Sequence, residues 1–206
     1  KSRREDAGKL MALAGFGGEG GETVEERRLM DRVLSHDAVA SALRKADFTD
    51  SPFFNIGLET QAFRDLARRY QREIFECFHD FALKNMRDGL PLLVSGGCGL
   101  NCDWNSDWRA TGLFADVFVP PCANDSGSAI GTAADAQFAL TGNAKLDWSV
   151  YAGEDFVVDA TDPEGFVAER RDDAEIARRL ADGAVFAWVQ GPYEIGPRAL
   201  GNRSLL

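Results

Sequence analysis

The sequence is poor in histidine, in positive charge and in long apolar runs, and each shortage excludes a class of protein. Only two histidines occur, His36 and His79, so no local histidine cluster is available for metal binding or acid–base chemistry. Lys and Arg number 23 against 33 Asp and Glu, and this formal charge of −10 argues against a nucleic-acid-binding surface. No apolar run approaches the roughly 20 residues of a membrane-spanning helix, and no signal peptide stands at the start, so we expect a cytoplasmic protein without a membrane partner.

Paired cysteines are lacking as well. No two cysteines form a Cys-x-x-Cys pair, so the sequence favours reduced, partly buried thiols over a metal or disulfide role. The four are Cys77, Cys98, Cys102 and Cys122. The serines, histidines and cysteines also show no arrangement typical of a catalytic triad, which argues against a covalent intermediate on such a triad.

The composition that remains is that of a folded protein. At 45% hydrophobic and 27% charged residues, the 206-residue chain can bury a sizeable core in one domain or slightly more, and global disorder is excluded. The sequence starts at Lys1 instead of a methionine and stops at Leu206 directly after a dense motif. We therefore expect both ends to be cut from a longer chain.

The first half of the sequence predicts helices. Charges alternate with apolar residues such as Val39 between residues 23 and 46, which is typical of one or two surface helices. From Leu58 to Arg87, apolar residues recur at steps of three and four, and this spacing predicts a long amphipathic helix. Its stripe consists of Phe63, Leu66, Ala67, Tyr70, Ile74, Cys77, Phe78, Phe81 and Ala82. His79 lies beside the stripe, which favours a residue at the helix edge over a catalytic one.

A glycine-rich stretch near the start satisfies the dinucleotide-binding pattern G-x-G-x-x-G through Gly15, Gly17 and Gly20. Such a fingerprint has to follow a strand and open a helix. Here it follows residues 9–14, which have a helical pattern, and leads into a polar segment. The sequence therefore favours a flexible turn over a nucleotide site.

The second half predicts an α/β fold. The run "PLLVSGG" and residues 116–119 have the apolar character of short buried parallel strands, and residues 128–140 form a small-residue helix. This alternation predicts a mainly parallel sheet with a ligand crevice at the carboxyl ends of its strands. After a boundary at "TDPEG", residues 173–181 are predicted as a helix and residues 184–189 as a strand.

Two groups of unusual residues follow the predicted parallel strands. Gly96 and Gly97 allow the backbone to approach a phosphate or ribose, and Asn101 offers both a donor and an acceptor, although a tight turn is the alternative. Asp125 leaves the second strand ahead of Gly127, whose neighbourhood opens a helix with free amides suited to an anion. An aspartate at this place ligates a divalent metal or simply caps the helix, and both interpretations stay open.

A third group lies in "EIGPRALGNRS". Arg198 and Arg203 flank glycines and stand near Ser204. Guanidinium groups bind phosphate and carbamoyl oxygens through paired hydrogen bonds, and glycines let backbone donors join them. In an acidic chain this loop, whose one acidic neighbour is Glu194, favours an anion-binding site over a solvated surface loop.

Four motifs, in this order and at these separations, resemble the carbamoyltransferases that make carbamoylated antibiotics and nodulation factors. They are "GKLMALAGFG", "SGGCGLNCDWN", "VFVPPCANDSGSAIGTA" and "GPYEIGPRALGNRS". The family includes the cephalosporin, tobramycin, novobiocin and ansamycin O-carbamoyltransferases. The four motifs together are far more specific than any one of them.

The resemblance implies two α/β domains and an ATP-dependent reaction. Residues 1–155 would be the C-terminal part of a sugar-kinase/actin-like domain similar to the proteins that make threonylcarbamoyladenosine on tRNA, and residues 156–206 would begin a YrdC-like domain. Carbamoyl phosphate and ATP would form carbamoyl adenylate, and the carbamoyl group would pass to a hydroxyl of a small natural-product acceptor. The 206 residues alone are expected to be inactive, and a homodimer is left open.

The family's site residues carry over onto the matching positions. The resemblance implies adenosine contacts for Gly96, Gly97 and Asn101, and a metal, iron, on Asp125. It also implies that Arg198, Arg203 and Ser204 form the loop that holds carbamoyl phosphate and the ATP phosphates. The family's His-x-x-x-His metal ligands have no counterpart in this sequence and are expected before Lys1.

Two other functions stay open from the sequence. One is an ATP-dependent kinase or a threonylcarbamoyl-type tRNA transferase of the same superfold, neither of which needs the string "GPRALGNRS". The other is a non-catalytic nucleotide-binding fragment. The string therefore favours the carbamoyltransferase over the first of these.

Overall fold

The chain forms two compact units in a computed structural model that describes residues 7–35, 43–87, 89–157, 165, 167 and 169–206. The first unit combines Lys1–Leu92 with Asn101–Val117, and the second combines Leu93–Leu100 with Phe118–Leu206. His36, Val39 and residues 161–164 of the predicted "TDPEG" boundary lie outside the described residues. The domain boundary at 155/156 stays a prediction.

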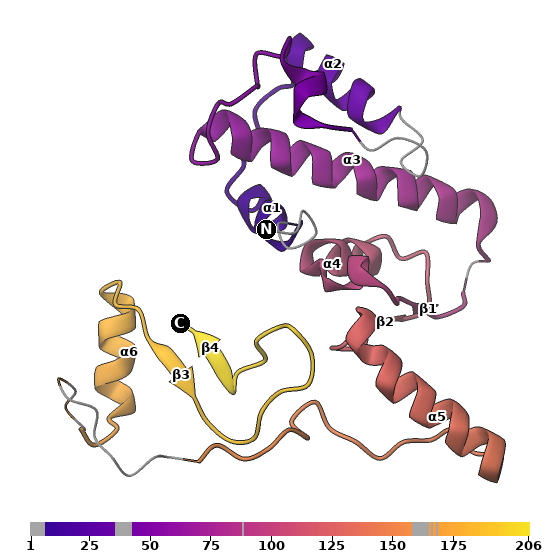
Figure 1. Cartoon of the computed structure of the whole chain (residues 1–206), viewed down its shortest axis with the longest axis vertical. Helices are drawn as coiled ribbons and strands as arrows, with labels where there is room; N and C mark the ends of the chain where they lie inside the picture. The colour runs from indigo at the N-terminus through magenta and orange to yellow at the C-terminus, as the bar shows by residue number, and fades with distance from the viewer. Residues whose placement is uncertain (1–6, 36–42, 88, 158–164, 166, 168) are drawn as a thin grey trace. The chain divides into compact units, whose positions relative to one another are not determined.

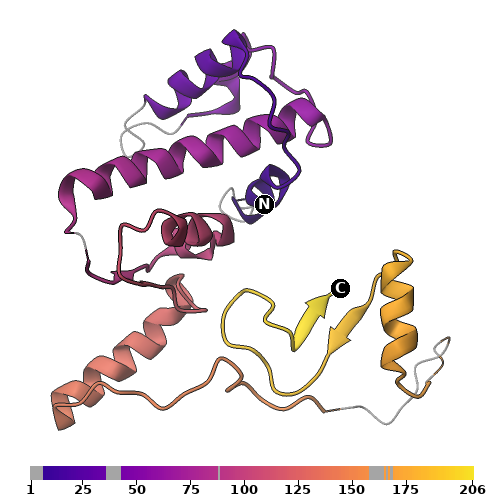
Figure 2. The ribbon, with the colours of Figure 1, turned by 180° about the vertical axis from the view of Figure 1, so that it is seen from behind.

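The first unit is helical and is organised around one long helix. Its elements are α1 (Ala7–Ala14), α2 (Val24–Leu34), the 3-10 helix η2 (Lys45–Phe48), α3 (Gln61–Asn85) and α4 (Cys102–Ala110). Both views show α3 between α2 on one side and α1 and α4 on the other (Figures 1 and 2). The glycine-rich turn follows α1, which confirms that a helix and not a strand precedes the G-x-G-x-x-G pattern.

The predicted amphipathic helix is confirmed with shorter bounds. α3 begins at Gln61 because the Thr60 side chain caps it, accepting a hydrogen bond from the Phe63 backbone N–H at 3.3 Å. Its predicted stripe is buried at Leu66, Ala67 and Ala82. The stripe is not buried along its whole length, since Phe81 is 63% exposed.

The prediction of partly buried thiols is wrong for most of the cysteines. All four are free, as expected, but only Cys122 is buried, and Cys77, Cys98 and Cys102 are exposed. Cys77 shows the reason. It lies in the second half of α3. The apolar spacing suggests that this half is packed against other elements, but the described residues leave much of its surface exposed.

Aromatic side chains dock α4 against α3. The Trp104 indole Nε1–H donates to the Gln71 carbonyl at 3.0 Å, and the Trp104 ring meets Phe78 edge-on with centroids 5.6 Å apart. One turn later, Trp108 packs edge-on against Phe75 at 4.9 Å. Such pairs add to the energy of apolar burial and fix the position of α4.

The described strands form two small sheets. β1 (Leu92–Leu93) pairs with β2 (Val117–Phe118), and the hydrogen bonds Leu92 N–H to Asp116 O and Val94 N–H to Phe118 O advance together along both strands, as in a parallel pair. β3 (Ala187–Val189) pairs antiparallel with β4 (Arg203–Leu205). The parallel pair confirms the prediction for the first two strands.

The second pair of strands lies beyond the segment for which the sequence predicts a parallel sheet. The chain between β3 and β4 folds back without a crossover helix, so the second pair is antiparallel. The remaining elements of the second unit are η3 (Gly97–Leu100), η4 (Asp125–Gly127), α5 (Ser128–Thr141) and α6 (Asp173–Ala181). α5 and α6 confirm the predicted helices, and none of the described helices is long and apolar enough to cross a membrane.

A buried ion pair joins α2 to α3. Arg69 is 9% exposed and Glu26 is 6% exposed, with Nη2 of the arginine 3.5 Å from Oε2 of the glutamate. The same Glu26 oxygen accepts the Thr23 backbone N–H at 2.6 Å and closes the capping box of α2. Packing and capping of α2 therefore converge on one carboxylate.

We predict that Arg69→Met destabilises the protein by about 3 kcal/mol, because it leaves the Glu26 carboxylate buried without its cation. The measurement is thermal unfolding of the complete gene product, followed by circular dichroism. Arg72→Met is the matched control, since Arg72 lies on the same helix and its side chain is 63% exposed. Equal losses of stability in the two variants would contradict the role of the buried pair.

Candidate functional site

Three of the motifs singled out in the sequence meet in the second unit. The Gly96 backbone N–H donates to the Ala123 carbonyl at 2.7 Å and joins the first motif to the second. The Arg198 guanidinium donates to the Leu100 carbonyl from Nε at 3.2 Å and from Nη2 at 2.7 Å, which joins the third motif to the first. Residues that are about 100 positions apart in the sequence are therefore held together through backbone carbonyls.

The glycine turn after β1 lies directly against the second motif. Gly96 has φ +96°, in the region that favours glycine, and Gly97 begins η3 with an exposed backbone. A β-carbon on Gly99 would come within 2.8 Å of the Ala123 β-carbon. The turn therefore needs glycine for its path and for its packing.

Asn101, which follows this turn, caps a helix in the first unit. It is 8% exposed, and its Oδ1 accepts the backbone N–H groups of Asp103 at 3.2 Å and Trp104 at 3.3 Å. These are the contacts of an N-cap, so the structure gives the Asn101 oxygen a role in starting α4. A contact to adenosine stays a prediction.

Asp125 does not cap a helix, so that alternative is wrong. Asn124 stands at the N-cap of η4 and Gly127 at the N-cap of α5, where no side chain caps the helix. The Asp125 side chain is exposed and has no hydrogen bond or ion pair with the residues that the structure describes. Its carboxylate is therefore available at the start of α5.

The backbone around Gly127 is tightly packed. A β-carbon on Gly127 would overlap the Cys122 carbonyl oxygen, so only glycine fits at this turn into α5. The described residues contain no group of three or more His, Cys, Asp and Glu side chains suited to a metal. Asp125 thus stands as a single candidate ligand in this part of the protein.

Arg203 holds the loop between β3 and β4 in shape. Its Nη1 donates to the carbonyls of Gln190 and Asn202, both at 2.8 Å, and its Nη2 donates to the Gly191 carbonyl at 3.1 Å. The guanidinium carbon also lies 4.2 Å from the centroid of the Tyr193 ring. Ser204 is half-buried in β4 opposite Trp188.

Glu194 is the residue of this loop that sequence reasoning did not assign. Its Oε1 accepts the backbone N–H of Leu200 at 2.6 Å and of Asn202 at 2.8 Å. Backbone hydrogen bonds hold the pKa of the Glu194 carboxyl below its ordinary value of 4.5. The bond from Asn202 contributes most, followed by those from Leu200 and Arg203. The signal in the sequence was its position as the one acidic residue beside a loop of glycines and arginines.

A short segment upstream fixes the other side of the loop. The Ile195 N–H donates to the Val150 carbonyl at 2.6 Å, and the Tyr151 hydroxyl donates to the Leu200 carbonyl at 2.9 Å. A β-carbon on Gly196, at φ +108°, would overlap the Pro121 carbonyl oxygen. The loop is thus a rigid scaffold that holds the guanidinium groups of Arg198 and Arg203, and positive charge of this kind favours the binding of an anion.

We predict that Glu194→Ala loosens the loop, because the amides of Leu200 and Asn202 lose their shared acceptor. Hydrogen exchange at these two amides should become about tenfold faster, with a smaller change in Glu194→Gln, which keeps an acceptor oxygen. Exchange that is unaltered in both variants would argue against this role.

The hydrogen bonds from the Leu200 and Asn202 amides to Glu194 should depend on pH. Because its folded-state pKa is lowered, the ionised Glu194 carboxylate stabilises the loop above the pKa of the unfolded chain, and this contribution is lost as the pH falls through the lower folded-state pKa. In NMR titrations the amide signals of Leu200 and Asn202 should therefore move with a midpoint below 4.5.

Comparison with known proteins gives two family matches. The description "Carbamoyltransferase N-terminus" matches residues 2–134, and "Carbamoyltransferase C-terminus" matches residues 177–206. Two similar proteins are the 3'-hydroxymethylcephem-O-carbamoyltransferases of Streptomyces clavuligerus, 49% identical, and Amycolatopsis lactamdurans, 47% identical, each over all of this chain and 40% of the relative. Nodulation protein U of Rhizobium tropici is 39% identical over 88% of this chain and 32% of the relative. The chain thus spans about 40% of the length of the curated cephem relatives that it matches.

Proposed function

Because the chain belongs to the carbamoyltransferase family, we propose that the protein carrying it transfers a carbamoyl group to a hydroxyl of a small-molecule acceptor. The observation that supports this most directly is the meeting of the glycine turn, the Asp125 segment and the Arg198 loop in one unit. By analogy with the named substrate of the cephem relatives, we propose a hydroxymethylcephem or a related hydroxylated natural product as the acceptor.

We propose that the donor is carbamoyl phosphate and that ATP activates it as carbamoyl adenylate. Carbamoyl phosphate gives up its phosphate to water, and the resulting carbamate oxygen attacks the α-phosphorus of ATP and displaces pyrophosphate. The acceptor hydroxyl then attacks the carbamoyl carbon, its proton is lost, and AMP leaves. No protein nucleophile is required, which agrees with the lack of a triad-like arrangement in the sequence.

In this scheme the second unit binds the anionic parts of the substrates. Backbone around Gly96 and Gly97 approaches the nucleotide, and the turn at Gly127, where no side chain caps the start of α5, faces a phosphate. The loop of Arg198, Arg203 and Ser204 holds carbamoyl phosphate and the ATP phosphates. Its support is the carbonyl and carboxylate contacts that fix the loop before any ligand arrives.

A divalent metal, iron by the family resemblance, fits Asp125 in part. The exposed carboxylate can supply one oxygen ligand, and we propose that the remaining ligands come from elsewhere in the complete gene product. Such a metal supplies positive charge against a phosphate.

The family resemblance is also the basis of our proposal for the domain structure. We propose that residues 1–155 belong to a sugar-kinase/actin-like domain and that residues 156–206 begin a YrdC-like domain. The two family matches support this division, because they end and begin on opposite sides of residue 155.

The reaction is tested by incubating the complete gene product with carbamoyl phosphate, ATP and a hydroxymethylcephem. We expect the carbamoylated acceptor to form together with equal amounts of AMP and pyrophosphate, because the adenylate breaks the bond at the α-phosphorus. Formation of ADP and a phosphorylated acceptor would show a kinase instead. Omission of carbamoyl phosphate is the control and should abolish AMP release.

The role of Asp125 is tested by Asp125→Ala. We expect carbamoyl transfer to fall by about 100-fold, because charge stabilisation next to the reacting phosphate is lost. Asp135→Ala is the matched control, since Asp135 is an exposed aspartate of the same helix α5, and it should leave the rate unchanged. Normal transfer by Asp125→Ala would contradict the metal role and leave the carbamoyltransferase proposal intact.

A further inference from the structure

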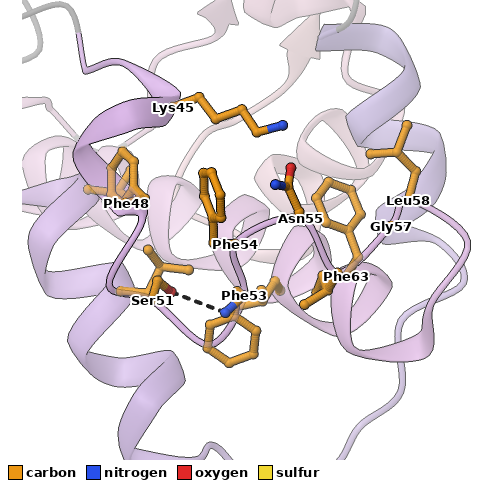
Figure 3. A pocket seen from close by; sticks show the side chains of 13 residues that line it. Lys45, Phe48, Ser51, Phe53, Phe54, Asn55, Gly57, Leu58 and Phe63 are labelled. Carbon is orange, nitrogen blue, oxygen red and sulfur yellow. Dashed lines mark hydrogen bonds between the residues drawn. The ribbon is translucent and has the colours of Figure 1, made fainter.

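The first unit contains an apolar pocket that none of the sequence motifs predicts. It has a volume of about 450 Å³ and is open to solvent, and this size falls in the range of small-molecule sites. Four phenylalanines are among the residues that line it, namely Phe48, Phe53, Phe54 and Phe63 (Figure 3). Aromatic walls of this kind favour a ligand with a flat, apolar body, which can stack on the rings or meet their edges.

The pocket is assembled from three elements that other contacts hold in place. α2 contributes Leu29 and Val33, α3 contributes Phe63 and Leu66, and η2 with the following loop contributes the remainder. Arg32 of α2 ties this loop down, since its Nη1 donates to Asp50 Oδ1 at 2.9 Å.

The Arg32 guanidinium also lies 4.8 Å above the centroid of the Phe48 ring. The walls are therefore fixed from outside the pocket, and the charge of this arginine is compensated by Asp50. This leaves the interior free of a structural ion pair.

Of the 13 described residues that line the pocket, Lys45 alone is charged. Its Nζ lies 5.4 Å from the centroid of the Phe54 ring, and it makes no ion pair or hydrogen bond with the residues that the structure describes. Figure 3 shows the amino end of Lys45 directed toward the side-chain amide of Asn55. A cation and an amide thus stand together at the exposed rim, above an apolar floor.

Asn55 is held toward this rim by an unusual backbone. Its φ of +59° makes it the one non-glycine residue with positive φ among the described residues, a conformation that asparagine tolerates better than most residues. Its amide has no hydrogen bond within the described part of the chain. It therefore offers both a donor and an acceptor to a ligand.

We propose that this pocket binds the acceptor, and that the acceptor is a small hydroxylated organic acid with a flat ring body. The ring body lies against the phenylalanines, and the carboxylate meets Lys45 and Asn55. One lysine matches one carboxylate, whereas the several negative charges of a nucleotide would meet a single cation in this pocket. A neutral sugar would leave the charge of Lys45 without a counterpart.

This inference rests on the proposed function, because it names the acceptor of that reaction, but its first test needs no turnover. Calorimetry of the complete gene product compares the free acid of a hydroxymethylcephem with its methyl ester, in the absence of ATP and carbamoyl phosphate. We expect the acid to bind at least about tenfold more tightly than the ester, because the ester cannot pair with Lys45. Failure of the acid to bind, or equal affinities for acid and ester, would overturn the proposal.

Two variants at the rim of the pocket test whether Lys45 and Asn55 bind the carboxylate of the acid. Lys45→Gln should weaken binding of the acid about tenfold and leave the ester unaffected. Asn55→Asp, which tolerates the same backbone conformation, should also weaken binding of the acid through repulsion. Lys84→Gln is the control, since Lys84 is an exposed lysine of α3 outside the pocket.

The outcomes separate this inference from the proposed function. If the acid binds through Lys45 but no carbamoylated product or AMP forms, the pocket stands and the proposed reaction fails. If transfer proceeds and the KM for the acid is the same in the wild type, Lys45→Gln and Asn55→Asp, the reaction stands and the pocket is not the acceptor site.

Discussion

Four glycines of the second unit have no room for a β-carbon, and the arrangement of the candidate site depends on three of them. Gly99 packs against Ala123, Gly127 against the Cys122 carbonyl and Gly196 against the Pro121 carbonyl. All three contacts converge on residues 121–123, which link β2 to α5. An alanine at any of these glycines would push one motif away from the others, because backbone and short side chains cannot yield as a long flexible side chain can.

Charged side chains then hold together the segments that the glycines allow to approach one another. Arg198 reaches the Leu100 carbonyl, Arg203 gathers three carbonyls of its own loop, and Glu194 gathers the backbone amides of the same loop. The carbonyls meet cations and the amides meet an anion, so both polarities of the loop backbone are satisfied within it. The arginines that the sequence suggests as ligand-binding groups therefore also hold the backbone of the site in place. A substitution at either arginine would change the loop conformation as well as any contact to a ligand.

The sequence predicted the positions of helices better than the pairing of strands. α6 was placed at its observed bounds and α3 within a few residues of them, because the spacing of apolar residues that predicts a helix is a local pattern. The antiparallel pairing of β3 with β4 was missed, since it depends on how a loop folds back and leaves no periodic pattern. At the site, the motifs identified which segments matter, but the partners of Arg198 and Glu194 are backbone groups of residues whose side chains carry no signal.

The pocket of the first unit was invisible to sequence reasoning for a related reason. Phosphate-binding loops need glycines and arginines in narrow geometries, which leaves a recognisable string of letters. An apolar acceptor needs only phenylalanines at a suitable separation, and phenylalanines are equally common in a protein core. The informative residues are instead the partners of the rings, because Lys45 lies above the Phe54 ring without an ion pair among the described residues and Asn55 has a positive φ. Under the proposal made for this pocket, acceptor choice resides in ordinary side chains whose meaning depends on the fold.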